Sequence, residues 1–291
     1  MKRTTIILAV SMILTGLCFA QQGYVVAGHS YSYHHGVNDT DFLIYKLGAD
    51  GGKRWRKNFG GLGDDFGFSI HQTTDGGYIV AGYTYSYTHG TGDQDFLIYK
   101  LDAGGRKLWR KNLGGSGNDS ARSIRQTSDG GYIVSGSSTS YAHGGEDFLI
   151  YKLNASGGKQ WRKNLGGASI ENANSIQQTA DGGYIVAGVT YSFVTGPGSD
   201  SDFFISRLRA DGKELWWRHM GGILFDAGYS VQQTADGGFV VAGDSMSYSS
   251  GSDADVLIFR LQANGELFWG GWVNLGGPLY DGAFAIALTE D

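Results

Sequence analysis

A short glycine-rich motif recurs along this chain at nearly constant intervals, and this periodicity constrains the fold more than any other feature. The motif Asp-Gly-Gly-aromatic begins at Asp75, Asp129, Asp181 and Asp236, with spacings of 54, 52 and 55 residues. A fifth copy, shortened at its front, runs from Gln22 to Gly28. A period of about 50 residues indicates a repeat architecture in which each repeat is one supersecondary unit.

Each repeat contains four segments with the character of short β-strands. The first is the run Gly-Gly-Tyr-Ile-Val-Ala-Gly, and the second is Asp-Phe-Leu-Ile-Tyr-Lys-Leu, present at 41–47 and 95–101. The third surrounds a Trp such as Trp55, and the fourth reads Ser-Ile-x-Gln-Thr, as at Ser69. Short apolar runs bounded by glycine predict strands, and helical apolar spacing is absent after the first 20 residues. Four strands per repeat are typical of a β-propeller blade, with a β-solenoid as the main alternative.

The two ends of the chain carry complementary parts of one repeat. The N-terminal part starts at the Gly-Gly-Tyr strand, at 22–28, and the chain ends just after a strand of the fourth type at 285–289. We therefore expect an all-β fold at 21–291, a five-bladed β-propeller of four-stranded antiparallel blades. Three N-terminal strands and one C-terminal strand would complete one blade, which removes an open sheet edge that favours aggregation.

The first 20 residues have the composition of a secretory signal peptide. Lys2 and Arg3 precede a mostly apolar stretch at 6–17, and a small residue suits cleavage near Ala20-Gln21. This stretch is shorter than the roughly 20 residues of a membrane span. We expect the mature chain to have no membrane span and to be secreted, periplasmic or at the cell surface.

Charge and cysteine content limit the classes of partner. Cys18 is the only cysteine and lies in the leader, so the mature chain is predicted to contain no disulfide. The chain has 23 basic and 28 acidic residues and a net charge of −5, which removal of Lys2 and Arg3 lowers to −7. An acidic chain argues against nucleic acid or an anionic membrane as a partner.

The repeat resembles that of secreted bacterial and archaeal β-propellers with Asp-Gly-Gly-Tyr repeats, and more distantly quinoprotein-like and WD-type blades. The residues that carry the resemblance are Asp-Gly-Gly-Tyr-Ile-Val-Ala-Gly, as at 75–82, and Leu-x-Ala-x-Gly-x-x-x-Trp, as at 101–109. The resemblance extends over the whole chain after the leader. It implies the fold but no activity, because propellers carry many unrelated functions.

Two acidic positions recur in every repeat, on the face that should carry the longer loops. One opens the Asp-Phe-Leu-Ile strand and the other precedes the Ser-Ile-x-Gln-Thr strand. The structural interpretation is that these carboxylates accept backbone N–H bonds and tie adjacent blades together. Clustered carboxylates also make calcium a candidate ligand of the first set. The first set is Asp41, Asp95, Asp147, Asp202 and Asp255, and the second is Asp65, Asp119, Glu171, Asp226 and Asp281.

Aromatic and histidine side chains recur in the loops before the Asp-Phe-Leu-Ile strands. Aromatic rings beside polar groups bind sugar faces or anchor protein partners, and Tyr also packs half-buried between blades. The three histidines lie on successive blades and are predicted to be too far apart to share a zinc ion. The candidate binding residues are Tyr33, His35, Tyr87, His89, Tyr141, His143, Phe193 and Tyr248.

The near identity of the repeats argues against an active site. A glycosidase needs two carboxylates in unlike environments, and no nucleophile triad, metal-ligand spacing or phosphate loop is found. We expect a non-catalytic module that binds protein or glycan, or serves in assembly, through its loop-rich face. The alternatives are a multivalent lectin, an extracellular polysaccharide hydrolase and an accessory subunit of a cell-surface complex. Departures from the repeat gather near the end, at Pro197, Trp216, Trp217 and 270–272.

Overall fold

The computed structural model describes residues 23–33, 35, 39–196, 200–249, 251 and 253–289. Every regular element in these residues is a β-strand, and no helix there is long and apolar enough to span a membrane. The chain divides into two compact units, 1–134 with 153–158 and 135–152 with 159–291. The predicted signal peptide at 1–20 lies outside the described residues.

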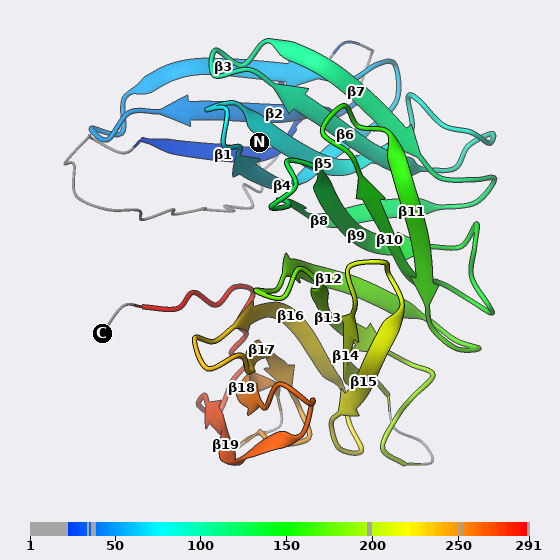
Figure 1. Ribbon diagram of the computed structural model, residues 1–291, viewed down its shortest axis with the longest axis vertical. Coiled ribbons are helices and arrows are strands. Elements are labelled where there is room, and N and C mark those ends of the chain that lie inside the picture. Colours follow the sequence, from blue (N-terminus) through cyan, green and yellow to red (C-terminus); the bar gives the residue numbers. More distant parts are fainter. Residues whose placement is uncertain are drawn as a thin grey trace. The chain divides into compact units, whose positions relative to one another are not determined.

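The described strands form five sheets, each a meander of strands in chain order (Figure 1). The first sheet contains β1 (Tyr24–Ser30), β2 (Asp41–Leu47) and β3 (Lys53–Phe59). The second contains β4 (Asp65–Gln72), β5 (Tyr78–Thr84), β6 (Asp95–Leu101) and β7 (Lys107–Leu113). The third contains β8 (Asp119–Gln126), β9 (Tyr132–Ser138), β10 (Asp147–Leu153) and β11 (Lys159–Leu165).

The fourth and fifth sheets repeat the same plan. The fourth contains β12 (Glu171–Gln178), β13 (Tyr184–Thr190), β14 (Asp202–Leu208) and β15 (Glu214–Met220). The fifth contains β16 (Asp226–Gln233), β17 (Phe239–Ser245), β18 (Asp255–Leu261) and β19 (Leu267–Leu275). The repeated four-stranded antiparallel sheets confirm the all-β repeat fold, and the strands predicted at 41–47 and 95–101 are confirmed as β2 and β6.

The Asp-Gly-Gly-aromatic motif makes the tight turn between the first two strands of a sheet. Asp75 accepts hydrogen bonds from the amide of Gly77 (3.0 Å) and from the Nζ of Lys100 (2.8 Å). Gly76 has a φ of 78°, which glycine adopts without steric cost. Hydrogen bonds from Lys100 and Thr73 lower the pKa of Asp75 to about 2.

The aromatic residue of this motif packs against the Trp of the preceding repeat. The ring centroids of Trp55 and Tyr78 lie 5.6 Å apart in a T-shaped arrangement, which is favourable for aromatic pairs. The two sequence motifs therefore form one contact between successive repeats. The same contact joins Trp109 to Tyr132, Trp161 to Tyr184 and Trp216 to Phe239.

Alternating apolar side chains of the inner strands form a core in each unit. In the first unit Phe42, Ile44 and Ile70 are fully buried, and in the second unit Phe203 and Ile205 are. Burial of a side chain of this size contributes about 1.5–3 kcal/mol. The core therefore accounts for stability without disulfides.

The C-terminal segment differs from the strand predicted at 285–289. Residues 276–289 form no strand, and the first sheet has three strands where the other sheets have four. The amide of Ile286 nevertheless donates to the Oγ of Ser230 (3.2 Å). The amide of Ile124 makes the same bond to Ser69 (3.2 Å), from the first strand of one sheet to that of the sheet before. The segment thus has the local contact of a first strand, but no neighbouring strand among the described residues.

Candidate functional site

In four repeats the recurrent acids are buried in pairs at the starts of two strands, whereas Asp281, the predicted partner of Asp255, is exposed and begins no strand. Asp41 begins β2 and Asp65 begins β4, and neither side chain is exposed. A Cβ on Gly60 would overlap Oδ1 of Asp41 and Oδ2 of Asp65, so the two carboxylates require glycine here. Three further pairs enclose a glycine: Asp95 with Asp119 at Gly114, Asp147 with Glu171 at Gly166, and Asp202 with Asp226 at Gly221.

Burial raises the pKa of four of these carboxylates. It raises the pKa of Asp65, and the hydrogen bonds that this side chain accepts from Ser86 Oγ (2.7 Å) and Gly61 N (2.9 Å) oppose the rise. The nearby charge of Asp41 raises the pKa of Asp65 further. Burial also raises the pKa of Asp41, Asp95 and Asp226. The bond from the backbone amide of Gly61 to Asp65 is of the kind expected if these acids accept backbone N–H bonds.

Some carboxylate oxygens of the pairs make no hydrogen bond to the protein. They include Oδ1 of Asp41, Asp65, Asp95, Asp147 and Asp202. Among the described residues no group of three or more His, Cys, Asp or Glu side chains is arranged to hold a metal ion. Calcium at these acids stays a prediction, and each pair alone would supply only two side-chain ligands.

Each loop histidine of the first three repeats contacts the Asp of its own repeat. Nδ1 of His143 donates to Oδ2 of Asp147 over 2.6 Å. The backbone amide of His143 donates to the same oxygen (3.0 Å), so the contact fixes the loop to β10. Because every histidine binds a different carboxylate, the three do not converge on one ligand. The other two contacts are His35 with Asp41 and His89 with Asp95.

The fourth repeat reaches the same result with different residues. The loop position holds Thr195, whose Oγ1 donates to Oδ2 of Asp202 (2.7 Å). His219, on β15, lies 2.9 Å from the same oxygen. The third repeat has Asn164 at the position of His219. The histidine has therefore moved from the loop to the last strand while the carboxylate keeps its partner.

The loop aromatic side chains are each covered by a side chain of the last strand. The guanidinium of Arg110 lies 3.6 Å from the ring centroid of Tyr87, and the Tyr87 hydroxyl donates to the carbonyl of Gly60. Arg56 covers Tyr33 at 3.5 Å, and Arg162 covers Tyr141 at 3.6 Å. In the last two repeats Trp217 covers Phe193 at 4.9 Å, and Trp272 covers Tyr248 at 5.5 Å. These rings hold the loops and adjacent repeats in place.

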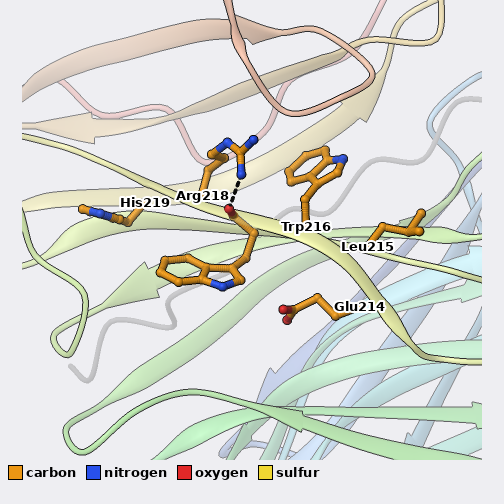
Figure 2. A pocket seen from close by; sticks show the side chains of 6 residues that line it. Glu214, Leu215, Trp216, Arg218 and His219 are labelled. Carbon is orange, nitrogen blue, oxygen red and sulfur yellow. Dashed lines mark hydrogen bonds between the residues drawn. The ribbon is translucent and has the colours of Figure 1, made fainter.

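The outer surface of β15 contains a shallow hollow, lined by residues 214–219 (Figure 2). Trp216 and Arg218 lie on one side of the strand and Glu214 lies on the other. Trp216 Nε1 donates to the carbonyl of Ala263 (3.1 Å), and Arg218 Nε donates to that of Gly265 (3.0 Å). Trp216 and Arg218 thus secure the turn of the following repeat.

A different group of side chains gathers at the loop-rich ends of β1, β4 and β5. Phe66 lies between His29 and Tyr83, with ring centroids 4.7 and 4.8 Å away. Tyr31 meets His29 at 6.3 Å and Tyr85 meets Tyr83 at 5.9 Å, both edge to face. We call these five rings the aromatic row. Their positions hold other residue types in the third repeat, where Ser120 stands for Phe66, Ser137 for Tyr83 and Thr139 for Tyr85.

The second unit has different side chains at positions equivalent to those near the aromatic row. Asp244 is equivalent to Tyr83, and Tyr229 is equivalent to Phe68. Asp244 is 1% exposed and accepts hydrogen bonds from the Tyr280 hydroxyl and the amide of Ala283 (3.1 Å). Burial raises the pKa of Asp244. Tyr229 and Phe284 lie 5.1 Å apart, and burial raises the pKa of Tyr229 to about 12. These acid and phenol groups are therefore neutral over a wider pH range than in water.

The predicted site residues and the aromatic row are thus different groups. The predicted loop residues pair within their own repeats, whereas the row was not among the predicted sites. Comparison of the repeats position by position would have found it, because Phe66 and Tyr83 replace small polar residues of the third repeat. The regularity of the motifs directs attention to the invariant positions instead.

Comparisons with known proteins give limited similarity. No family model matches the sequence. Regulatory protein FlaEY of Caulobacter vibrioides is 26% identical over an alignment of 139 positions, which covers 42% of this chain and 15% of that protein. A protein of unknown function from Bacteroides caccae is similar over 81% of this chain and 77% of its own, with a TM-score of 0.45 and 12% identity. Sqt1 of Chaetomium thermophilum is similar over 84% of this chain and 67% of its own, with a TM-score of 0.42 and 9% identity.

Proposed function

We propose that this protein is a secreted, non-catalytic β-propeller that binds a protein or glycan through the loop-rich ends of its sheets. One observation supports this proposal. Side chains that recur in every repeat contact one another, whereas side chains that differ between repeats gather at the loop-rich ends of β1, β4 and β5. Loops and strand ends on a rigid scaffold are the usual place for binding residues.

The invariant groups have little capacity left for chemistry. Asp147 is bonded to His143, and Tyr87 lies under Arg110 with its hydroxyl bonded to Gly60. Catalysis by paired acids would need carboxylates in unlike environments. The same pair of buried acids recurs at Gly60, Gly114, Gly166 and Gly221, which favours a structural role.

Photo-cross-linking tests the binding proposal directly. A photoreactive residue is placed at Tyr85, which is 43% exposed at the loop-rich end, and in a control at Gly104, in the short turn after β6. The mature protein is then irradiated with envelope and culture fractions of the producing organism. We expect one adduct from position 85 that is absent from position 104. Equal labelling from both positions, or no adduct from position 85 together with no glycan bound, would contradict the proposal.

The closed five-bladed ring is part of the same proposal. The contact of Ile286 with Ser230 and the missing strand of the first sheet suggest that 285–289 pairs with β1. By equivalence with the pairing of His71 and Ile79 in the second sheet, Ala287 would face Val25. Closure would remove the unpaired edge of β1.

A disulfide between these strands tests the closure. The mature chain with Val25→Cys and Ala287→Cys should form an intramolecular disulfide and resist unfolding by about 3–5 kcal/mol more than its reduced form. A second double variant, Val26→Cys with Ile286→Cys, lies one residue along the strands. It is needed because hydrogen-bonded and non-hydrogen-bonded pairs alternate along antiparallel strands and differ in their Cα separation. Variants that carry only one of these cysteines should not change the mobility of the monomer on a non-reducing gel. Only disulfide-linked dimers, or free thiols in both double variants, would contradict closure within one chain.

A further inference from the structure

We infer that the aromatic row of Tyr31, His29, Phe66, Tyr83 and Tyr85 is a binding platform for one neutral hexopyranose oligosaccharide. The inference rests on the proposed binding function and specifies its ligand class and residues. It moves the ligand away from the repeated loop tyrosines to a group that occurs once in the described residues.

The row presents an extended aromatic surface within the first unit. Phe66 stands directly opposite Tyr83 in the pairing of β4 with β5, and His29 comes from β1. His29, Phe66 and Tyr83 lie on three different strands, and rigid strands position a site better than loops do, while Tyr31 and Tyr85 directly follow the ends of β1 and β5. Tyr31 and Tyr85, at its two ends, are 57% and 43% exposed, while His29, Phe66 and Tyr83 are half-buried. Ring faces carry partial negative charge and attract the C–H groups of a pyranose.

Polar groups of both signs lie beside the rings. The guanidinium of Arg122 lies 4.5 Å from the ring centroid of Phe68, whose ring is 5.5 Å from Tyr83. Asp64 is near enough to influence the pKa of His29 and of Tyr83. A carboxylate accepts hydrogen bonds and a guanidinium donates them, as sugar hydroxyls require.

The charges at the row favour a neutral ligand. Burial lowers the pKa of His29 and raises that of Tyr83, so both groups stay uncharged near neutral pH. Asp64 and Arg122 then contribute one negative and one positive charge. The carboxylate of Asp64 would repel an anionic ligand, and the guanidinium of Arg122 would repel a cationic ligand. A ligand with hydroxyl groups and no net charge satisfies both.

The size of the row also favours a small ligand over a protein. A stable protein interface buries about 800 Å² on each partner and centres on an apolar core. The row consists of five side chains bordered by polar groups. Small-molecule sites typically combine aromatic lining with a few polar groups, as here.

The repeats themselves supply the test variants. Tyr85→Thr and Phe66→Ser introduce the residues of the third repeat, where Thr139 directly follows β9 and Ser120 lies in β8. Tyr85 is exposed, so its replacement leaves the fold intact even if Phe66→Ser does not fold. Tyr248→Ala, in a loop of the second unit, is the matched control.

Calorimetry with the mature protein tests the inference. The probes are hexaoses of glucose, mannose, galactose and N-acetylglucosamine, each in α- and β-linked forms. We expect at least one to bind with a stoichiometry of one, and Tyr85→Thr to weaken it at least tenfold. The control Tyr248→Ala should bind as the wild type does.

Three outcomes would overturn the saccharide platform. They are no binding of any probe, equal binding by Tyr85→Thr, and binding at several equivalent sites that Tyr248→Ala weakens. Cross-linking separates this failure from that of the proposed function. A protein adduct from position 85 without hexaose binding rejects only the saccharide, whereas the absence of both rejects the binding function as well.

Discussion

The second and fourth repeats solve the same packing problem with different side chains. In the second repeat, Arg110 covers Tyr87 and the loop residue His89 contacts the buried Asp95. In the fourth repeat, Trp217 covers Phe193 and the strand residue His219 contacts the buried Asp202. The covered ring and the paired carboxylate are constant, while the residues that provide them differ.

This difference indicates what the repeat needs. A buried carboxylate without a partner costs several kcal/mol, so a repeat that loses its loop histidine must replace it. Thr195 and His219 together make this replacement in the fourth repeat. Such compensation is expected of structural groups, because a catalytic role would tie a histidine to one position. Exchange of residues between the two repeats tests this interpretation.

The largest effect is expected from loss of the histidine in either repeat. His219→Ala leaves the Thr195 hydroxyl as the one side-chain donor to Asp202 among the described residues, and His89→Ala removes the ring that bonds Asp95. We expect each change to lower the free energy of unfolding by about 2–3 kcal/mol. Urea unfolding at neutral pH measures it.

The exchange that recreates the second repeat within the fourth is the control. Thr195→His with His219→Asn should restore stability to within about 1 kcal/mol of the wild type, since the carboxylate regains a histidine. His219→Asn alone should remain destabilised. Equal stability of the single and double variants would show that the histidine position is not interchangeable.

A smaller effect is expected at the side chains that cover the loop rings. Trp217→Ala removes an aromatic partner of Phe193 and of Phe204, and should cost about 2 kcal/mol. Arg110→Ala removes a cation–π contact with Tyr87 and should cost about 1 kcal/mol. Thermal unfolding of both variants measures the difference. A larger loss of stability for Arg110→Ala than for Trp217→Ala would contradict the expectation that the tryptophan holds its loop ring more strongly than the arginine does.

The repeat fold was predictable because its signals are local and occur several times. Glycine at position 76 and the strands at 41–47 and 95–101 follow from turn chemistry and apolar runs. The requirement for Gly60 was not predictable, since it arises from two carboxylates that approach from different strands. The C-terminal strand at 285–289 was expected from its sequence alone, and the described residues give it only the contact to Ser230.

The sequence predicted which types of side chain matter at the candidate site, but not which of them contact one another. Tyr, His and Asp were identified as the groups of interest, but the sequence does not reveal that Arg110 covers Tyr87 or that His143 bonds Asp147. These contacts depend on side-chain direction at the ends of strands. The aromatic row was missed because Phe66 lies at a position that varies between repeats, where the motif gives no signal.

The smallest effect concerns the turn aspartates, which the two repeats pair with different cations. Asp75 binds Lys100 in the second repeat and Asp181 binds Arg207 in the fourth. The pKa of Asp75 is lowered to about 2 by its bonds from Lys100 and Thr73, so its stabilisation is complete above the ordinary Asp value of about 3.9 and is lost as the pH falls toward 2. Because the Asp75 side chain is 57% exposed, solvent limits the contribution to about 1 kcal/mol.

Asp75→Asn should therefore lower the urea midpoint at neutral pH and flatten its decline on acidification, and Asp181→Asn should do the same. For Asp65, at the other end of β4, we expect the opposite dependence of stability on pH. Its pKa is raised by burial, so the folded state keeps a proton that the unfolded chain releases, and its contribution to stability decreases as the pH rises through that interval. Asp65→Asn should remove this decrease. Parallel pH profiles for Asp65→Asn and Asp75→Asn would contradict the assignment of opposite roles to the two ends of the strand.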